Sequence, residues 1–101
     1  MSDEIFNIIY NKSLDLLSRR EHSFKEIKEK LSARFENKEI IESVIEKLSD
    51  NNLVNNTRFA EAYVSARKRK GFGPKKIAFE LLSKGVDESI LNKIIIKLIL
   101  F

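Results

Sequence analysis

Six basic side chains crowd into ten residues of this chain, on either side of a glycine-rich turn. The segment 67–76 reads RKRKGFGPKK. Helices often end at a left-handed glycine and often start with proline, so Gly71 predicts the end of one helix, and Gly73 and Pro74 predict the N-cap and first residue of the next. A helix start presents free amide groups and partial positive charge to anions. The chemistry predicted at this junction is therefore the binding of phosphate groups.

The basic residues of the junction are candidates for phosphate contacts, and the competing interpretation is a solvated helix face. An arginine forks onto a phosphate whereas a lysine acts as a point charge, so Arg67 and Arg69 are better suited to defined contacts. Helical spacing lets only part of the run face one way. The candidates in this segment are Arg67, Lys68, Arg69, Lys70, Lys75 and Lys76.

Two further candidates lie earlier in the chain. Arg19 and Arg20 stand at the end of another predicted helix, and Arg19 precedes Arg69 by fifty residues. One interpretation is that both bind a partner. The alternative, left open by the sequence, is that they complement the helix dipole and pair with Glu21 or Glu26.

Other kinds of chemistry find little support. The chain has no cysteine, and its single histidine, His22, has no spaced carboxylate partner, so it is interpreted as a capping or surface residue rather than a metal ligand. Gly71 and Gly73 lack the GxxxxGK spacing of a nucleotide-binding loop. No nucleophile stands next to a base, and no cofactor fingerprint is present. We expect a non-enzymatic protein with no catalytic residue, no cofactor and no metal.

The aromatic and acidic residues are assigned to the frame of the protein. Phe72 has two interpretations, stacking on an unpaired base or packing into the core as a staple between two helices, and packing is favoured. Phe59 and Tyr63 are assigned to the core. A solvated outer face is predicted for Glu36, Glu39, Glu42 and Glu46.

The charge of the chain is unevenly distributed. A length of 101 residues with 43% hydrophobic residues fits one folded domain. Residues 1–50 contain nine Lys or Arg against eleven Asp or Glu, a net charge of −2, whereas residues 51–101 contain ten against four, a net charge of +6. This surplus favours encounter with nucleic acid and weakens with salt, but it says nothing of sequence recognition.

Export and membrane insertion are not expected. Residues 1–10 carry Asp3 and Glu4 and lack the basic start and cleavage site of a secretory signal. The apolar run 94–101 is interrupted by Lys97 and is far shorter than the roughly 20 residues that cross a bilayer. Together with the absence of cysteine, this favours a cytoplasmic protein without a membrane contact.

Hydrophobic periodicity predicts helices throughout and no strand. Helices are expected at 3–18, at 24–35 behind a Ser23–Glu26 capping box, and behind Asn37 as a cap. A fourth is expected from Asn56 or Thr57, a fifth from Pro74 to about Lys84, and a sixth behind Asp87. The predicted buried residues of the fourth and fifth are Phe59, Ala62, Tyr63, Ala66, Ile77, Leu81 and Leu82.

A shift of fifty residues lays one half of the chain over the other. Core residues coincide, as Ile27 does with Ile77 and Leu31 with Leu81, and the cap Asn37 falls on Asp87. Because caps and cores match at one offset, we predict two three-helix repeats, at about 3–50 and 56–101, in an elongated, curved array. So small a unit is expected to need its neighbour to complete its core.

Two segments resemble a known family. LLSRREHSFKEIKEKL at 16–31 and RFAEAYVSARKRKGFGPKKIAFELLSKGV at 58–86 are similar to the RecX family of bacterial recombinase regulators. The resemblance implies tandem three-helix repeats and a protein that binds RecA, the strand-exchange ATPase, in the groove of its filament on single-stranded DNA. It also implies restraint of recombinase, ATPase and co-protease activities, in recombination, DNA repair and the SOS response.

Family members usually carry three repeats, and two are counted here. Ile96, Ile99 and Leu100 point off the predicted buried face of the last helix. A helix that is apolar all round is normally buried all round. We therefore expect either that the chain is a fragment or short member, and that this helix self-associates or meets a third repeat, or that a few aliphatic residues are simply exposed.

The functional prediction is a regulator whose basic second repeat contacts the phosphates of single-stranded DNA in a RecA filament. The alternative is a helix-turn-helix module that binds DNA without a recombinase, with the fifth helix reading bases through Lys75, Lys76, Ala78 and Phe79. A third possibility is a protein-only adaptor whose charge serves solubility. The sequence leaves open whether such a regulator caps filament ends or lies in the groove.

Overall fold

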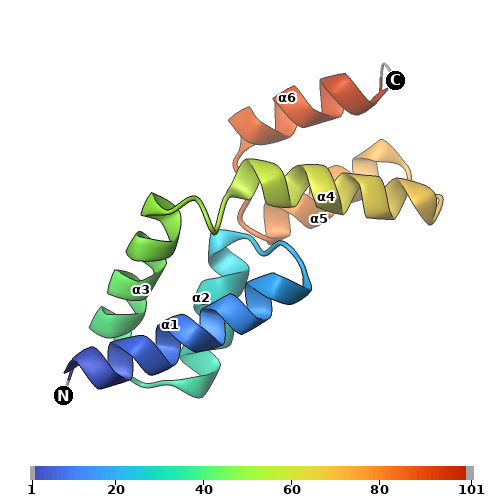
Figure 1. Cartoon of the computed structure of the whole chain (residues 1–101). Helices are drawn as coiled ribbons and strands as arrows, with labels where there is room; N and C mark the ends of the chain where they lie inside the picture. The colour runs from blue at the N-terminus through green and yellow to red at the C-terminus, as the bar shows by residue number, and fades with distance from the viewer. Residues whose placement is uncertain (1, 100–101) are drawn as a thin grey trace.

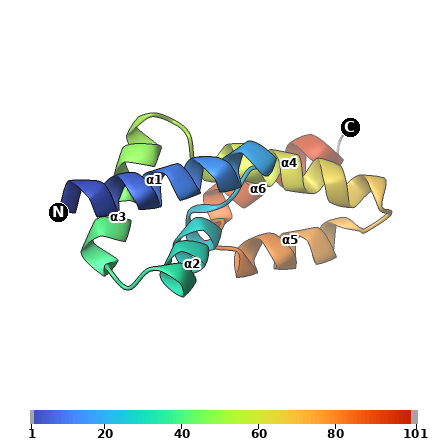
Figure 2. The ribbon, with the colours of Figure 1, turned by 60° about the horizontal axis from the view of Figure 1, so that its bottom comes forward.

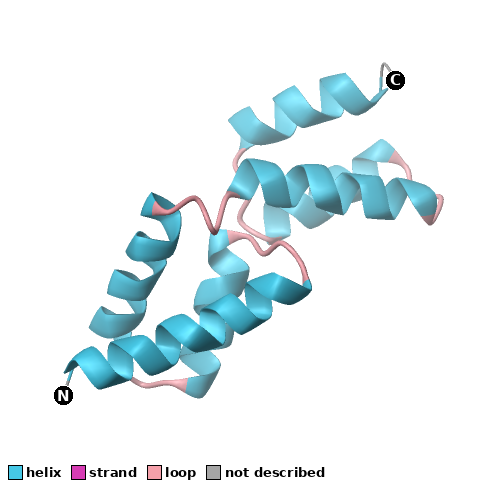
Figure 3. Cartoon of the chain, in the orientation of Figure 1, coloured by secondary structure: helices cyan, strands magenta, loops and turns pink. Residues whose placement is uncertain are grey.

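The computed structural model describes residues 2–99, and over that range the chain is helical, with no strand (Figure 1, Figure 3). The predicted all-α fold is confirmed. The helices are α1 (Ser2–Arg19), α2 (Phe24–Arg34), α3 (Lys38–Asp50), α4 (Asn56–Arg69), α5 (Pro74–Ser83) and α6 (Glu88–Ile99).

The helices form two units along the chain (Figure 1, Figure 2). In the first unit α1, α2 and α3 pack together, and in the second unit α4, α5 and α6 pack together. The molecule measures 51 × 24 × 20 Å, and its radius of gyration of 15.0 Å exceeds the roughly 13 Å of a compact chain of this length. Two units placed one after the other therefore give an elongated molecule.

Local sequence signals fix where α2 and α6 begin. The hydroxyl of Ser23 accepts a hydrogen bond from the Glu26 amide, and the Glu26 carboxylate accepts one from the Ser23 amide, which completes the predicted capping box. Asp87 accepts a hydrogen bond of 2.9 Å from the amide of Ile90 and so caps α6 as predicted. Asn37 stands at the N-cap of α3, but its side chain makes no capping hydrogen bond.

Helix α4 begins and ends at polar signals. Asn55 accepts a hydrogen bond of 2.9 Å from the amide of Arg58, and it caps a helix that starts at Asn56 as expected. The helix stops at Arg69, and Gly71 takes a left-handed φ of +88° beyond it. Because glycine has no Cβ, it adopts this conformation without strain.

Each unit has a hydrophobic cluster of its own. The buried members in the first unit and the loop after it are Ile9, Ile27, Leu31, Ile41, Val44, Leu48 and Val54. Those in the second unit are Phe59, Ala60, Val64, Ile77, Leu81, Val86, Leu91 and Ile94. Buried residues recur at the predicted offset, as in the pairs Ile9 and Phe59, Ile27 and Ile77, Leu31 and Leu81, Ile41 and Leu91, and Val44 and Ile94. The predicted repeat is confirmed.

Two of the predicted core positions are wrong. Ala62 is exposed, and α4 buries Ala60 and Val64 instead, on the face that also carries Phe59. An alanine fits either face of a helix, so its place is set by the larger residues around it. Leu82 is 44% exposed, because it stands about 100° around α5 from the fully buried Leu81.

The two units meet through hydrogen bonds. Asn56, the first residue of α4, accepts a bond of 2.9 Å from the amide of Phe24 and donates one of 3.4 Å to the carbonyl of Gly85. The ammonium group of Lys25 donates to the carbonyl of Ser83 at 3.0 Å. A single asparagine thus joins the start of α2, the start of α4 and the turn before α6.

Ion pairs also connect the units. Arg58 pairs with Glu21, and Lys84 lies 3.4 Å from Glu26. Each hydrophobic cluster is formed by residues of its own unit and, in the first unit, of the loop after it, whereas these hydrogen bonds and ion pairs join polar groups of the two units. That a unit needs its neighbour to complete its core stays a prediction.

Helix α6 is apolar on more than its packed face. Leu91 and Ile94 are buried against α4 and α5, whereas Ile96 is 60% exposed, as its predicted place off the buried face requires. The side chain of Ile99, and Leu100, lie outside the described residues. Over the described range, no helix combines the length and apolarity that crossing a bilayer requires.

Candidate nucleic-acid interface

The predicted junction between α4 and α5 is a sharp turn, which we call the basic corner and define as residues 67–76 (Figure 2). The amide of Phe72 donates to the carbonyl of Arg67 at 3.2 Å, and the amide of Gly71 donates to that of Lys68 at 2.9 Å, the pattern of a Schellman motif. Gly73 is the N-cap of α5 and has no side chain to cap its first amide groups. The corner therefore combines a fixed backbone with uncapped amides.

Arg67 is the inner member of the basic corner. Its guanidinium donates two hydrogen bonds to the carboxylate of Glu80, at 3.0 and 2.8 Å, and both side chains are about one fifth exposed. Its Cζ atom lies 3.7 Å from the ring centre of Phe72 and 5.9 Å from that of Tyr63. The guanidinium that made Arg67 a strong candidate for a phosphate contact is thus bound to a carboxylate of the protein itself, and this pair connects α4 to α5.

The same contacts shift the pKa values of Glu80 and Tyr63. Partial desolvation acts to raise the pKa of Glu80, but hydrogen bonds from Arg67 and Tyr63 outweigh it and hold the pKa below its ordinary range. Burial and the bond to Glu80 raise the pKa of Tyr63. Glu80 is therefore a carboxylate at neutral pH, and Arg67 keeps its partner.

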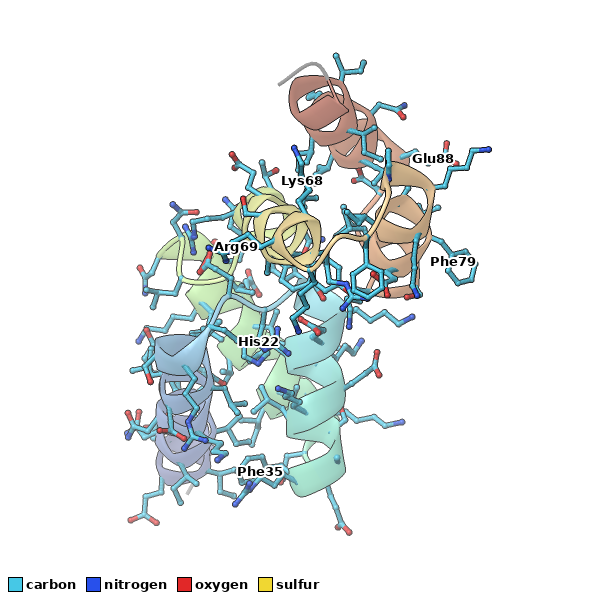
Figure 4. The ribbon with its side chains drawn as sticks, turned by 90° about the vertical axis from the view of Figure 1, so that its right-hand side faces the viewer. His22, Phe35, Lys68, Arg69, Phe79 and Glu88 are labelled. Carbon is cyan, nitrogen blue, oxygen red and sulfur yellow. The ribbon has the colours of Figure 1, made fainter. Side chains whose placement is uncertain are left out.

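The other basic side chains of the corner lie at the surface and diverge. Lys68 and Arg69 project to different sides of α4 (Figure 4). Arg69, Lys70 and Lys75 are exposed and form no ion pair or side-chain hydrogen bond with another residue of the described range. Lys76 lies over Phe72, with its ammonium nitrogen 4.5 Å from the ring centre. Three cations of the corner are thus available to an anion.

Phe72 packs against the second hydrophobic cluster, and the favoured interpretation is confirmed. The guanidinium of Arg67 and the ammonium of Lys76 both lie over its ring. Cations over an aromatic face are attracted by its electron-rich centre. The ring therefore serves as the platform on which the corner is built.

Arg19 and Arg20 lie at the end of α1, toward the joint between the units. Arg19 is 3.3 Å from Asp15. Arg20 donates to the Glu26 carboxylate at 3.0 Å and to the Glu21 carbonyl at 2.8 Å, so the pairing with Glu26 that the sequence left open is present. A contact of either arginine with DNA stays a prediction.

Glu26 collects three positive or donating groups from two units. Its carboxylate is 13% exposed and meets Arg20, Lys84 and the amide of Ser23. Burial acts to raise the pKa of Glu26, and the hydrogen bonds from Arg20 and Ser23 lower it further than burial raises it. The capping role of Glu26 was predicted from the sequence, and its second role in joining the units follows from the placement of Lys84.

His22 is 2% exposed, so its predicted surface place is wrong (Figure 4). Its Nδ1 atom lies 3.1 Å from the Arg20 carbonyl, which only accepts, so Nδ1 donates and Nε2 accepts from the ammonium of Lys30 at 2.9 Å. Burial, followed by the charge of Arg20, lowers the pKa of His22. In the described part of the chain, no cluster of three or more His, Asp or Glu side chains is placed to hold a metal.

Phe79 is a surface residue, as the alternative of a base-reading fifth helix requires, but the prediction for the RecA regulator gave it no role. It is 73% exposed on α5 and projects away from the bundle (Figure 4). The repeat offers a signal that finds it, because the matching residue of the first unit is Glu29, a charged residue typical of a solvated face.

Comparison with known families finds one match for each unit. The model described as RecX, first three-helix domain, matches residues 10–48. The model described as RecX, second three-helix domain, matches residues 55–93 and includes the whole basic corner. The tandem order predicted from the sequence is the order of these two domains.

Curated relatives give the same result. The chain is 38% identical over 80 residues to the protein named Regulatory protein RecX of Pseudomonas fluorescens strain SBW25, a match that covers 79% of this chain and 52% of the relative. It is 36% identical over 83 residues to Regulatory protein RecX of Halorhodospira halophila, covering 82% of this chain and 52% of the relative. The chain thus spans about half the length of these relatives.

A solved structure shares the fold. The crystal structure of RecX from Lactobacillus salivarius superposes with a TM-score of 0.80 at 32% sequence identity. The superposition covers 95% of this chain and 62% of that one. The arrangement of both three-helix units, and not only the fold of each, is therefore similar in the two proteins.

Proposed function

This chain belongs to the RecX family, and we propose that it regulates RecA by binding the RecA filament on single-stranded DNA and restraining its recombinase, ATPase and co-protease activities. Both family domains of the match and the regulatory names of the relatives support this role. That the present 101 residues suffice for the activity is part of the proposal. So is the absence of catalysis and of a cofactor.

The observation that carries the proposal is the basic corner. Arg69, Lys70 and Lys75 stand on the outside of a turn whose shape is fixed by the pair of Arg67 with Glu80. Because the backbone of the turn is fixed, these cations start from defined positions, and a phosphate chain binds them at a lower entropic cost than it would on a mobile loop. We assign the corner to DNA phosphates and the remaining faces of the elongated molecule to RecA subunits.

The proposed mechanism is occupancy of the filament. In this proposal the elongated molecule, 51 Å in its longest dimension, lies along the groove and contacts more than one subunit. In that position it blocks the addition of subunits or the movements that ATP hydrolysis and strand exchange require. A contact of Arg19 and Arg20 with DNA phosphates is also part of the proposal.

Charge reversal at the corner tests the proposal. The variant Arg69→Glu, Lys70→Glu, Lys75→Glu removes three exposed cations and leaves Arg67 with its partner. We expect its half-inhibitory concentration against the DNA-dependent ATPase of RecA to rise about tenfold or more, because each lost phosphate contact weakens binding. A matched control, Arg34→Glu, Lys38→Glu, Lys93→Glu, changes the net charge equally at exposed positions away from the corner. Wild-type inhibition by the corner variant would refute the assignment.

The alternative of a DNA-binding module without a recombinase is separated by its preferred substrate. Helix α5 would be its recognition helix, yet Ala78 packs against the second cluster and α5 contains no arginine, asparagine or glutamine. Binding is measured on bare single strands, on duplex and on preformed filament, at two salt concentrations. Preference for the filament supports regulation of RecA, sequence preference on duplex supports the module, and binding to RecA without DNA supports a protein-only adaptor.

A further inference from the structure

Helix α5 has an apolar residue at the centre of its solvent face. Ile77 and Leu81 are buried, and Phe79 lies two residues from each, which places it about 200° around the helix from both. Its side chain is 73% exposed and points into solvent (Figure 4). Leu82, 44% exposed, continues this face one turn further on. A phenylalanine so placed contributes little to the core.

The first unit shows that the fold does not need an aromatic residue there. At the offset of fifty residues, Glu29 takes the place of Phe79 and Ser32 that of Leu82, while Lys25 matches Lys75. Both residues of α2 are exposed, and α2 packs in its unit as α5 does. The apolar character of the α5 face is thus a property of the second unit alone.

Two lysines stand one turn before Phe79 on α5. Lys75 and Lys76 lie four and three residues before Phe79, one turn along the helix and on either side of it. The one carboxylate of α5, Glu80, faces inward to Arg67. Centres of protein interfaces are depleted of charge, whereas a nucleotide offers an aromatic base and an anionic phosphate side by side. The charge around Phe79 complements the nucleotide.

We propose that Phe79 is a stacking platform for an unpaired nucleobase, with Lys75 and Lys76 binding the adjacent phosphates. This rests on the proposed function only in requiring that single-stranded DNA reach the basic corner. The platform lies about 6 Å along α5 from Lys75, since four residues of helix rise by that amount. Phe72 is unsuited to the same role because Arg67 and Lys76 lie over its ring.

Stacking on one side chain makes a distinct contribution to binding. Loss of a stacked aromatic side chain weakens single-strand binding by about 5- to 150-fold. The stacking does not depend on the base sequence, because every base has an aromatic face. Loss of the aromatic side chain leaves the salt dependence unchanged, since no phosphate contact is lost. Loss of a lysine lowers the slope of log affinity against log salt by about 0.7. The two kinds of contact are therefore separable by experiment.

The first experiment compares normal and abasic strands. Fluorescence anisotropy measures binding of wild type, Phe79→Ala, Phe79→Leu and Lys75→Ala to an oligothymidylate of about 20 nucleotides and to an abasic strand of equal length. We expect Phe79→Ala and Phe79→Leu to lose affinity for the normal strand by the stated factor at unchanged salt slope. On the abasic strand, wild type and both variants are expected to bind alike.

The second experiment places a reporter at the site. The chain contains no tryptophan, so Phe79→Trp gives a fluorescence signal without background and keeps an aromatic face. Stacking on a base quenches that signal. Glu29→Trp is the matched control, since it stands at the same position of the first unit. We expect quenching by oligothymidylate at residue 79 and none at residue 29.

Three outcomes would overturn the platform. They are wild-type affinity of Phe79→Ala for the normal strand, an equal loss on the abasic strand, and equal quenching at both tryptophans. A fourth outcome concerns Phe79→Leu. If this variant bound the normal strand with wild-type affinity, the platform would also be overturned, and the face would be assigned to an apolar protein partner instead. In each case the ATPase test of the corner variant still decides the proposed function, because that variant retains Phe79.

Discussion

The first half of the chain carries nine basic residues against eleven acidic ones, and the second half carries ten against four. At buried positions the two units agree, as in Leu31 and Leu81, both 0% exposed. At the centre of the solvent face of the middle helix they differ, with Glu29 in one and Phe79 in the other. The two units share the residues that pack in their cores. Their surface residues differ more freely, because a substitution at the surface usually changes the stability of the fold little.

The two units also differ in the side chains that lie beneath the turn after their first helix. At the same offset, His22 matches Phe72 and Lys30 matches Glu80. The first unit fills this space with a histidine bonded to a lysine, and the second with a phenylalanine beneath Arg67, which is bonded to Glu80. The same backbone arrangement thus holds a histidine–lysine pair in one unit and, in the other, an arginine–carboxylate ion pair that persists at neutral pH.

The largest expected effect comes from breaking the two cores in turn. Leu31→Ala and Leu81→Ala each remove a fully buried leucine and are expected to cost about 2–5 kcal/mol. Because the clusters are separate, each loss is expected to fall on its own unit. Hydrogen exchange resolved along the chain measures this, with faster exchange in α1–α3 for Leu31→Ala and in α4–α6 for Leu81→Ala.

An equal rise in exchange across both units, from either substitution, would contradict separate cores. Leu31→Met and Leu81→Met are the controls, since a swap that keeps the volume costs less than about 1.5 kcal/mol.

A smaller loss of stability is expected when the pH is lowered from 7.5 to 5.5, and the group responsible is His22 of the first unit. Because the pKa of His22 is lowered in the folded protein, the unfolded chain takes up a proton first as pH falls through about 6.5. The folded state is therefore stable at pH 7.5 and loses up to about 1.4 kcal/mol for each pH unit below 6.5, until His22 itself titrates. Urea unfolding at pH 7.5 and 5.5 measures the loss.

His22→Phe copies Phe72 and is expected to remove this dependence between pH 7.5 and 5.5. Glu26 also has a lowered pKa, but carboxylates lose stability only as pH falls below about 4.5, outside that window. If the variant and wild type lost the same stability over the window, His22 would not be the group responsible.

The smallest effect is expected at the joint. Asn56→Ala removes the bonds to Phe24 and Gly85 and is expected to cost about 0.5–1.5 kcal/mol. It also frees the two units to change their relative angle. Small-angle scattering is expected to give the variant a radius of gyration different from that of the wild type. Asn92→Ala, on the exposed face of α6, is the control, and an unchanged radius for both would show that Asn56 does not set the angle.

Features that depend on near neighbours in the chain could be predicted from the sequence. The capping box of Ser23 and Glu26 needs residues three apart, and the stop at Gly71 needs one residue of suitable conformation. Hydrophobic periodicity predicted the number and order of the helices, and the offset of fifty residues predicted their grouping into two units. Local physics and one internal comparison were enough for the fold.

Features that depend on how helices cross could not be predicted. Arg67 finds Glu80 thirteen residues later because α4 and α5 lie side by side, and no local pattern indicates that pair. The burial of His22 likewise depends on where Lys30 reaches back from α2. A list of basic residues therefore gave the location of the candidate site, and the packing decided which of its members remain exposed.

Gly85 has a consequence for how closely the two units approach each other. A Cβ atom at this residue would stand 2.8 Å from the Cβ of Lys25, which is anchored to the backbone of α2 and has no room to swing aside. Its φ of +85° also disfavours a side chain. Any replacement would have to push neighbouring units apart. The spacing of the two units therefore depends on the absence of a side chain at residue 85.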